Sequence, residues 1–218
     1  MYLIKMGYYI KMPKIIKELT GRYVFCNVPN VHEKTIYLTF DDGPTENITQ
    51  WILEKLNHYD IKATFFCIGK NVKELPNIYQ KILDNNHATG NHTNNHLNGF
   101  KTPFKLYHEN IKEAEQVIKS SLFRPPYGRI KPTYSYRIRK EYSIILWSLL
   151  SMDYKQNLNT QKSLDLLTKN LEPGSIIVFH DSLKAENNMK IMLPQFIEYA
   201  LKNDFKFEIL KHEIFNPN

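Results

Sequence analysis

From Lys34 onward, short runs of β-branched and aromatic residues alternate with longer amphipathic stretches, and this alternation limits the possible folds more than any other feature. Apolar strands that alternate with helices are typical of a parallel sheet covered on both faces. The runs that predict strands lie at residues 35–40, 63–68, 88–90, 122–123, 143–147, 175–179 and 205–210. The stretches that predict helices lie at residues 48–58, 72–85, 106–119, 164–170 and 189–202.

The stretch at residues 48–58 illustrates the helical pattern, because Ile48, Trp51, Ile52 and Leu56 all fall on one helical face. About seven β/α units of this kind fit either a compact, incomplete barrel or an open doubly wound sheet. Residues 1–34 precede the pattern and are expected to form an irregular N-terminal extension packed on the outside. Residues 35–218 would then form one α/β domain.

The composition supports a globular chain with one core. The 218 residues are enough for a full-sized domain, and 42% hydrophobic with 23% charged residues excludes a disordered tail, a collagenous repeat or a membrane bundle. The net charge of +7 favours anionic surroundings. However, the lysines are scattered and form no basic block, so no nucleic-acid partner is predicted. The two cysteines are too few for a disulfide scaffold, and Cys67 is expected in the core.

The N-terminal residues show no export signal. Lys5, Lys11 and Lys14 leave only residues 6–10 uncharged between them, which is shorter than the roughly 7–15 residues of a secretory apolar segment. No run approaches the roughly 20 apolar residues of a membrane span. A cytoplasmic location is therefore expected by default. The missing export signal has three possible explanations, which stay open: an intracellular or soluble substrate, another export route, or a start further upstream.

Polar residues follow five of the predicted strands, where a parallel β/α fold places its active site. Asp41 and Asp42 come directly after the first strand, and extended backbone would point their side chains in opposite directions. Either carboxylate could instead cap the following helix. His92 and His96 are four residues apart, so one helical turn would place both imidazoles on one face, as in metal sites. Chance alone also produces this spacing on an Asn-rich turn.

The three remaining clusters are similarly placed. Arg124 precedes two prolines, which fix the backbone and can aim the loop at a site or simply stiffen it. Asp153 follows the run at residues 143–147. His180 and Asp181 end the run at residues 175–179, and a histidine beside an aspartate suits either general acid-base work or a structural hydrogen bond. Polar clusters at five predicted strand ends together indicate an active site.

The ordered motifs resemble the polysaccharide deacetylase family, the NodB-homology domain of carbohydrate esterase family 4. The chain carries TFDDGP at 39–44, HTNNH at 92–96, RPPYG at 124–128, WSLLSMDY at 147–154 and VFHD at 178–181. KATFFCIG at 62–69 is similar to the family's second strand, and the resemblance covers about residues 34 to 210. It implies a distorted (β/α)7 barrel and a metal-dependent deacetylase acting on N-acetyl sugars.

The resemblance also implies residue roles. The metal ligands would be Asp42, His92 and His96. The catalytic groups would be Asp41 as general base, Arg124 as the partner that holds it ionised, the Tyr127 N–H as oxyanion donor, His180 as general acid and Asp153 as its modulator. The residues that touch substrate would be Tyr127, Val178 and Tyr154, with Val178 in place of the family's usual leucine against the acetyl methyl.

Several points stay open at this stage. Imidazole and carboxylate ligands accept Zn²⁺, Co²⁺, Ni²⁺ or Fe²⁺, and zinc is expected on availability. The family often has an aspartate where this chain has Leu150 and a tryptophan where it has Tyr154, so the exact N-acetylated carbohydrate does not transfer with the activity. A non-catalytic sugar-binding protein, a deacetylase of small molecules or lipid-linked sugars, and a non-haem iron oxygenase are the alternatives. The oligomeric state is not predicted.

Overall fold

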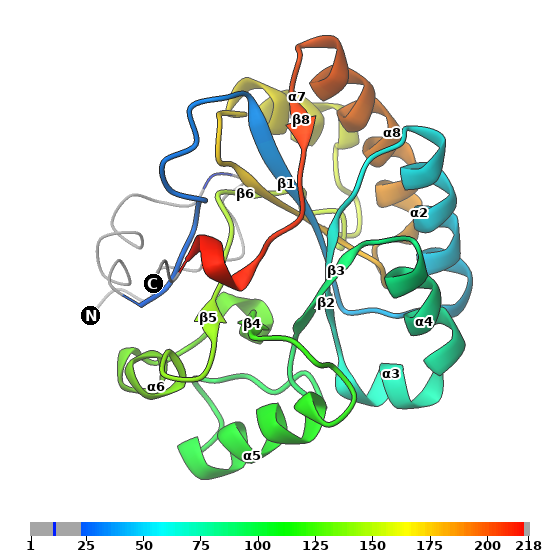
Figure 1. The fold of residues 1–218 in the computed structure, drawn as a ribbon. Coiled ribbons are helices and arrows are strands. Elements are labelled where there is room, and N and C mark those ends of the chain that lie inside the picture. Colours follow the sequence, from blue (N-terminus) through cyan, green and yellow to red (C-terminus); the bar gives the residue numbers. More distant parts are fainter. Residues whose placement is uncertain (1–10, 12–22, 216–218) are drawn as a thin grey trace.

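The computed structural model describes residue 11 and residues 23–215, and its centre is a parallel sheet that curls into a barrel with helices around it (Figure 1). The strands follow the order β5-β4-β3-β2-β1-β7-β6, and each neighbouring pair is parallel. Their bounds are β1 Thr35–Asp41, β2 Thr64–Cys67, β3 Ala88–Asn91, β4 Leu122–Phe123, β5 Ser143–Ile144, β6 Leu149–Leu150, β7 Ile176–His180 and β8 Lys206–Phe207. The predicted (β/α)7 class is confirmed.

The strand β1 lies at the middle of the sheet. It pairs with β7 from Tyr37 to Asp41, with β2 through its last three residues, and with β8 through Thr35 and Ile36. Six of its seven residues are buried. Neighbours on both edges and helices outside explain why this strand is an almost continuous apolar run.

The helices occupy the connections between the strands. The described helices are α2 Glu46–His58, α3 Gly69–Glu74, α4 Pro76–Asp84, α5 Phe104–Glu115, α6 Pro132–Ile138, α7 Thr160–Lys169 and α8 Glu186–Lys202, with 3₁₀ turns at η2 Pro126–Gly128 and η3 His212–Ile214. The helix α8 packs Phe196 against Phe179 of β7, with 5.9 Å between ring centroids. No helix within residues 23–215 is long and apolar enough to cross a membrane.

A single segment, residues 143–150, joins the two ends of the sheet. Its first two residues form β5 against β4, and its last two form β6 against β7. Between them the backbone changes neighbours: the Ile145 N–H donates to Phe123 O and the Ser148 N–H to Ile176 O. This change of partner breaks the expected strand at residues 143–147 into two short strands.

Residues 23–28 add a further buried segment beside this junction. The Phe25 N–H donates to Ile144 O, and the Val28 N–H donates to Gly174 O. The side chains of Val24, Cys26 and Val28 are buried. Residues 1–10 and 12–22 of the predicted N-terminal extension lie outside the described residues, and the domain boundary at residue 34 stays a prediction.

The predicted helix at residues 72–85 is in fact two helices. Leu75, between them, has φ −127° and ψ 53°, and Pro76 begins α4. Proline disfavours helical backbone in the residue before it and is well accommodated at the first helical position. The helix α6 was not predicted. It is short, begins at Pro132 and buries only Ser135 and Ile138, so its apolar pattern is weak.

Candidate active site

The ends of β1 and β3 bring Asp42, His92 and His96 together. Each offers one ligand atom, and these atoms all lie within 4.8 Å of one another. Asp42 Oδ1 is 3.1 Å from His96 Nε2 and 3.7 Å from His92 Nε2. Asp42 has a positive φ of 84°, a conformation that aspartate tolerates better than most residues. This turn lets two consecutive carboxylates, Asp41 and Asp42, reach different partners.

The two histidines lie on a loop rather than on the helical turn that their spacing predicted. Thr93 and His96 have φ values of 64° and 55°, which exclude a regular helix. The Asn91 side chain accepts from the Thr93 N–H, and the Asn110 side chain of α5 accepts from the N–H groups of the residues just after Thr93. Sequence reasoning missed Asn110, because nothing in its own neighbourhood marks it as a loop support.

The histidine geometry fits a metal ion. His92 Nδ1 lies 2.7 Å from Arg124 O, so it carries the proton and leaves Nε2 free to face Asp42. Burial lowers the pKa of His92 to about 4, which keeps the imidazole neutral as a ligand must be. Burial alone would raise the pKa of Asp42, but the hydrogen bond from His96 and the nearby histidines hold it well below its usual value. One carboxylate and two imidazoles are a common donor set for Zn²⁺ and related ions.

Asp41 is buried and paired with a fully buried arginine. Arg124 Nη1 donates to Asp41 Oδ1 at 2.6 Å and to Thr39 Oγ1 at 2.7 Å. Its Nε and Nη2 donate to the carbonyl oxygens of Ile145 and Leu146, where the segment 143–150 changes neighbours. Arg124 therefore joins the site to the junction of the sheet.

His180 faces Asp41 from the neighbouring strand, since the two residues are in register between β7 and β1. Asp153 accepts twice, from His180 Nδ1 at 2.7 Å and from the His180 N–H at 2.8 Å. Burial by itself lowers the pKa of His180, but the charge and hydrogen bond of Asp153 outweigh it and raise the pKa to about 9. Asp153 is fully buried, and Asn188 of α8 donates to its backbone oxygen.

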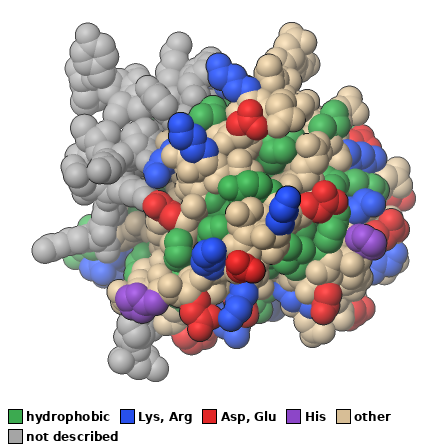
Figure 2. All heavy atoms as spheres, turned by 90° about the horizontal axis from the view of Figure 1, so that it is seen from above, with side chains coloured by type: hydrophobic (Ala, Val, Ile, Leu, Met, Phe, Trp, Pro, Cys, Tyr) green, Lys and Arg blue, Asp and Glu red, His purple; other side chains and the backbone are tan. Residues whose placement is uncertain are grey.

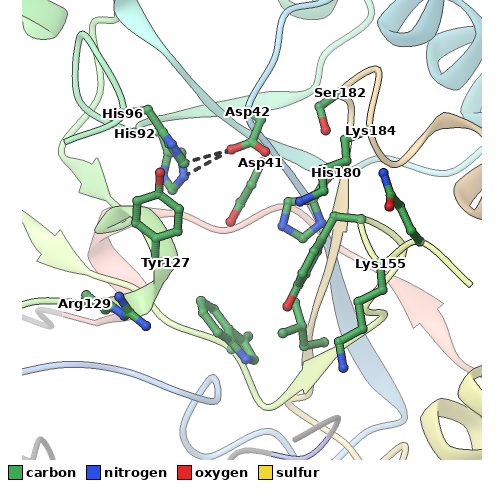
Figure 3. A pocket seen from close by; sticks show the side chains of 14 residues that line it. Asp41, Asp42, His92, His96, Tyr127, Arg129, Lys155, His180, Ser182 and Lys184 are labelled. Atoms are coloured by element: carbon green, nitrogen blue, oxygen red, sulfur yellow. Dashed lines mark ion pairs between the residues drawn. The ribbon is translucent and has the colours of Figure 1, made fainter. Parts of the chain in front are cut away.

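These groups line a cleft of about 850 Å³ (Figure 3). Asp42, His92 and His96 lie on one side and His180 on the other, with Asp41 between them. The ring of Tyr127 packs on His96 with 4.6 Å between centroids, and the ring of Tyr154 packs edge-on against His180 at 5.0 Å.

Not every predicted site residue reaches the cleft. Arg124 and Asp153 do not line the cleft, but they contact residues that do: Arg124 contacts Asp41, and Asp153 contacts His180. Val178 is fully buried in the core and does not line the cleft. Its neighbour in β6, Leu150, does line it, together with Trp147. These role assignments remain predictions.

Asp181 is a buried carboxylate at the end of β7, and no site role was predicted for it. Its Oδ2 accepts from Thr49 Oγ1 at 2.7 Å, and within residues 23–215 its Oδ1 has no hydrogen-bond partner. Gly43, directly after Asp42, lies so close that an added Cβ would overlap the carboxylate. Burial raises the pKa of Asp181 to about 8. The VFHD motif could have indicated a role for Asp181, because it places a second titratable residue directly after His180 at the end of a buried strand.

Curated bacterial proteins are similar to this chain. A Bacillus cereus peptidoglycan-N-acetylglucosamine deacetylase is 32% identical over 209 residues, which cover 90% of this chain and 96% of that protein. Another B. cereus protein of the same description is 32% identical over 172 residues, and the match spans 74% of this chain and 61% of that longer protein. The Bacillus subtilis peptidoglycan-N-acetylmuramic acid deacetylase PdaA is 31% identical over 183 residues, 77% of this chain and 67% of its own length.

Solved structures agree on the fold. The B. cereus Bc1960 peptidoglycan N-acetylglucosamine deacetylase has a TM-score of 0.84 at 26% identity and covers 95% of this chain and 98% of its own. The Bacillus anthracis protein BA3943, described as a pseudoenzyme, shares the fold with a TM-score of 0.74 at 22% identity, over 84% of this chain and 66% of its own. Residues 29–143 match the polysaccharide deacetylase family. With that match, and with a relative aligned along nearly all of both chains, this protein belongs to the polysaccharide deacetylase family, carbohydrate esterase family 4.

Proposed function

We propose that this chain hydrolyses the N-acetyl groups of amino-sugar units in peptidoglycan or chito-oligosaccharides and releases acetate. The observation that carries the proposal is the pairing of two opposed groups. Asp41 and His180 end neighbouring strands, and each is held on one side by its own buried partner, Arg124 or Asp153. Beside Asp41, the side chains of Asp42, His92 and His96 form a donor set that fits a divalent ion. The peptidoglycan deacetylases among the relatives support this substrate class.

Asp42, His92 and His96 would hold the ion. When bound, a divalent ion, with Zn²⁺ expected before Co²⁺, Ni²⁺ or Fe²⁺, supplies Lewis acidity to the acetamide carbonyl. The Arg124 carbonyl fixes the His92 tautomer, and the Asn91 and Asn110 side chains hold the loop that carries both histidines.

Asp41 would act as the general base. Arg124 donates to its Oδ1, which leaves Oδ2 to take a proton from the attacking water. The water oxygen bonds to the acetamide carbon. The Tyr127 N–H donates to no protein acceptor within the described residues. It would donate to the developing oxyanion, and one such donor is typically worth about 10²–10³ in rate.

His180 would act as the general acid. Asp153 accepts from Nδ1 and from the His180 backbone, so Nε2 is the nitrogen left to serve the substrate. A pKa of about 9 keeps the ring protonated at neutral pH. As the carbon-nitrogen bond breaks, Nε2 gives its proton to the departing amine, and acetate and the free amino sugar result. Trp147 and Leu150 supply apolar wall beside the reacting group.

Acetate release tests the proposal. The chain is stripped of metal, assayed on N-acetylglucosamine oligomers and peptidoglycan fragments, and assayed again after zinc or cobalt is restored. We expect acetate only with metal, and we expect Asp41→Asn to bind metal but to lose nearly all turnover. Full turnover in Asp41→Asn would refute the base assignment. Absence of both acetate and metal binding would favour a non-catalytic sugar-binding protein.

A further inference from the structure

The cleft carries a set of cations that the proposed chemistry does not use. Three of its 14 lining residues are basic, Arg129, Lys155 and Lys184. In Figure 3, Arg129 and Lys155 lie on opposite sides of one end of the cleft, and Lys184 lies beside His180. They come from three different strand-end loops, after β4, β6 and β7. We name these three residues the basic rim.

Among the described residues, no acidic side chain that lines the cleft pairs with Arg129 or Lys184. Only Asp41 and Asp42 are acidic among the lining residues, and Arg124 and the two histidines already engage them. Within residues 23–215, Arg129 and Lys184 form no ion pair with a carboxylate. A bound divalent ion and a protonated His180 would add further positive charge.

Charged side chains elsewhere on the molecule provide a comparison. On the face shown in Figure 2, basic and acidic side chains are interspersed. Many lysines elsewhere are paired, for example Lys73 with Glu113 at 2.9 Å and Lys206 with Glu33 at 2.9 Å. The basic rim is therefore a local concentration of one sign around a concave site, which is the arrangement that attracts and orients an anionic ligand.

We infer that the basic rim binds a carboxylate of the substrate, so that the cleft prefers glycans that carry a carboxylate near the reacting N-acetyl group over neutral ones. This inference rests on the proposed function and narrows its substrate class. Two sources offer that chemistry in peptidoglycan: the lactyl ether of muramic acid and the carboxylates of the peptide stems. Chitin-type oligomers offer none.

The experiment compares substrates that differ in charge. Four substrates are assayed at low and high salt. They are neutral N-acetylglucosamine tetramers, peptide-free peptidoglycan tetrasaccharides, the same tetrasaccharides with methylamidated carboxylates, and stem-bearing fragments. We expect a lower KM for the peptide-free anionic tetrasaccharide, with the advantage shrinking between about 0.01 M and 0.3 M salt as the Debye length falls from about 30 Å to under 8 Å. An advantage seen only with stems would support the inference with the stem as the carboxylate source.

The variant R129Q/K155Q/K184Q tests the residues themselves. Exposed charge pairs are each worth about 1.4- to five-fold, so KM for the anionic tetrasaccharide should rise about three-fold or more. The values of kcat and KM for the neutral tetramer should stay unchanged. The control K119Q/K140Q/K169Q removes the same charge at exposed lysines that precede β4, β5 and β7, at the opposite end of the strands. It should leave both substrates unchanged.

Some outcomes separate this inference from the proposed function. Equal KM values for neutral and anionic tetrasaccharides, or equal effects of the two triple variants, would overturn the basic rim as a carboxylate site while acetate release stands. If no substrate releases acetate, the proposed function fails. Titration calorimetry with Asp41→Asn and intact tetrasaccharides would then still decide the inference, by tighter or equal binding of the anionic one.

Discussion

Removing the Arg124 side chain should destabilise the protein far more than removing an exposed lysine from an ion pair of similar length. Arg124 is fully buried, donates to Asp41 at 2.6 Å, and satisfies the carbonyl oxygens of Ile145 and Leu146. In Arg124→Met, the Asp41 charge stays buried without its partner, which costs about 3–5 kcal/mol. Two carbonyl groups also lose their donors, at about 1 kcal/mol each. The expected loss of unfolding free energy is therefore about 5–7 kcal/mol, a large share of the roughly 5–15 kcal/mol of an ordinary domain.

A double-mutant cycle isolates the charge pair. Asp41→Asn in the Arg124→Met background removes the unpaired charge, so the double variant should recover about 2–4 kcal/mol relative to the sum of the single losses. Urea unfolding of the metal-free protein, followed by tryptophan fluorescence and circular dichroism, gives the four free energies. Lys73→Met is the matched control, since its 2.9 Å pair with Glu113 is exposed, and it should cost under about 1 kcal/mol. Strictly additive losses, or a loss below about 1 kcal/mol in Arg124→Met, would refute the reasoning.

The other predictions concern metal, pH and the unassigned carboxylate. Asp42→Ala and His96→Ala should each bind zinc or cobalt at least about ten-fold more weakly without unfolding, as calorimetry and circular dichroism would show; full metal occupancy in either would contradict the ligand assignment. Activity should fall as pH rises through about 9, where His180 loses its proton. Asp153→Asn should move this alkaline limb of the pH profile toward 6.5. An unmoved limb would show that Asp153 does not raise the pKa of His180. Because burial raises the pKa of Asp181 from 3.8 to about 8, the folded metal-free protein keeps a proton that the unfolded chain loses. Its stability should therefore decline between about pH 4 and 8, and Asp181→Asn should flatten that decline in urea midpoints measured across this range.

Much of the architecture could be predicted from the sequence, because buried parallel strands carry a strong local signal. The end of β1 and the placement of Asp41 and Asp42 followed from an apolar run that stops at two carboxylates. The short strand β6 could not be predicted, since Leu149 and Leu150 pair with β7 only after the backbone changes neighbours. That change depends on hydrogen bonds between distant segments, which local sequence does not encode.

The site was predicted as a set of residues but not as a geometry. Spacing suggested that His92 and His96 share a helical face, whereas a loop with two positive φ angles brings them together. The support for that loop comes from Asn110 on α5, through hydrogen bonds that span 15 or 16 positions. Val178 illustrates the opposite case: its place in the motif suggested contact with substrate, but it is fully buried in a core cluster with Leu150 and Met152. It lies two residues before His180, on the same face of β7, yet only His180 lines the cleft.

The register between β1 and β7 has a consequence for how the protein is made. Asp41 lies near the beginning of the domain and His180 near its end, yet they occupy paired positions. During synthesis, Asp41 and His180 can face each other only after β7 has left the ribosome and paired with β1. We therefore expect shortened chains that end before β7 to lack hydrolytic activity whatever local structure they hold. During refolding, the recovery of acetate release would then mark the time at which β7 pairs with β1. We expect this recovery after the helices have formed, because pairing between strands so distant in sequence is slow.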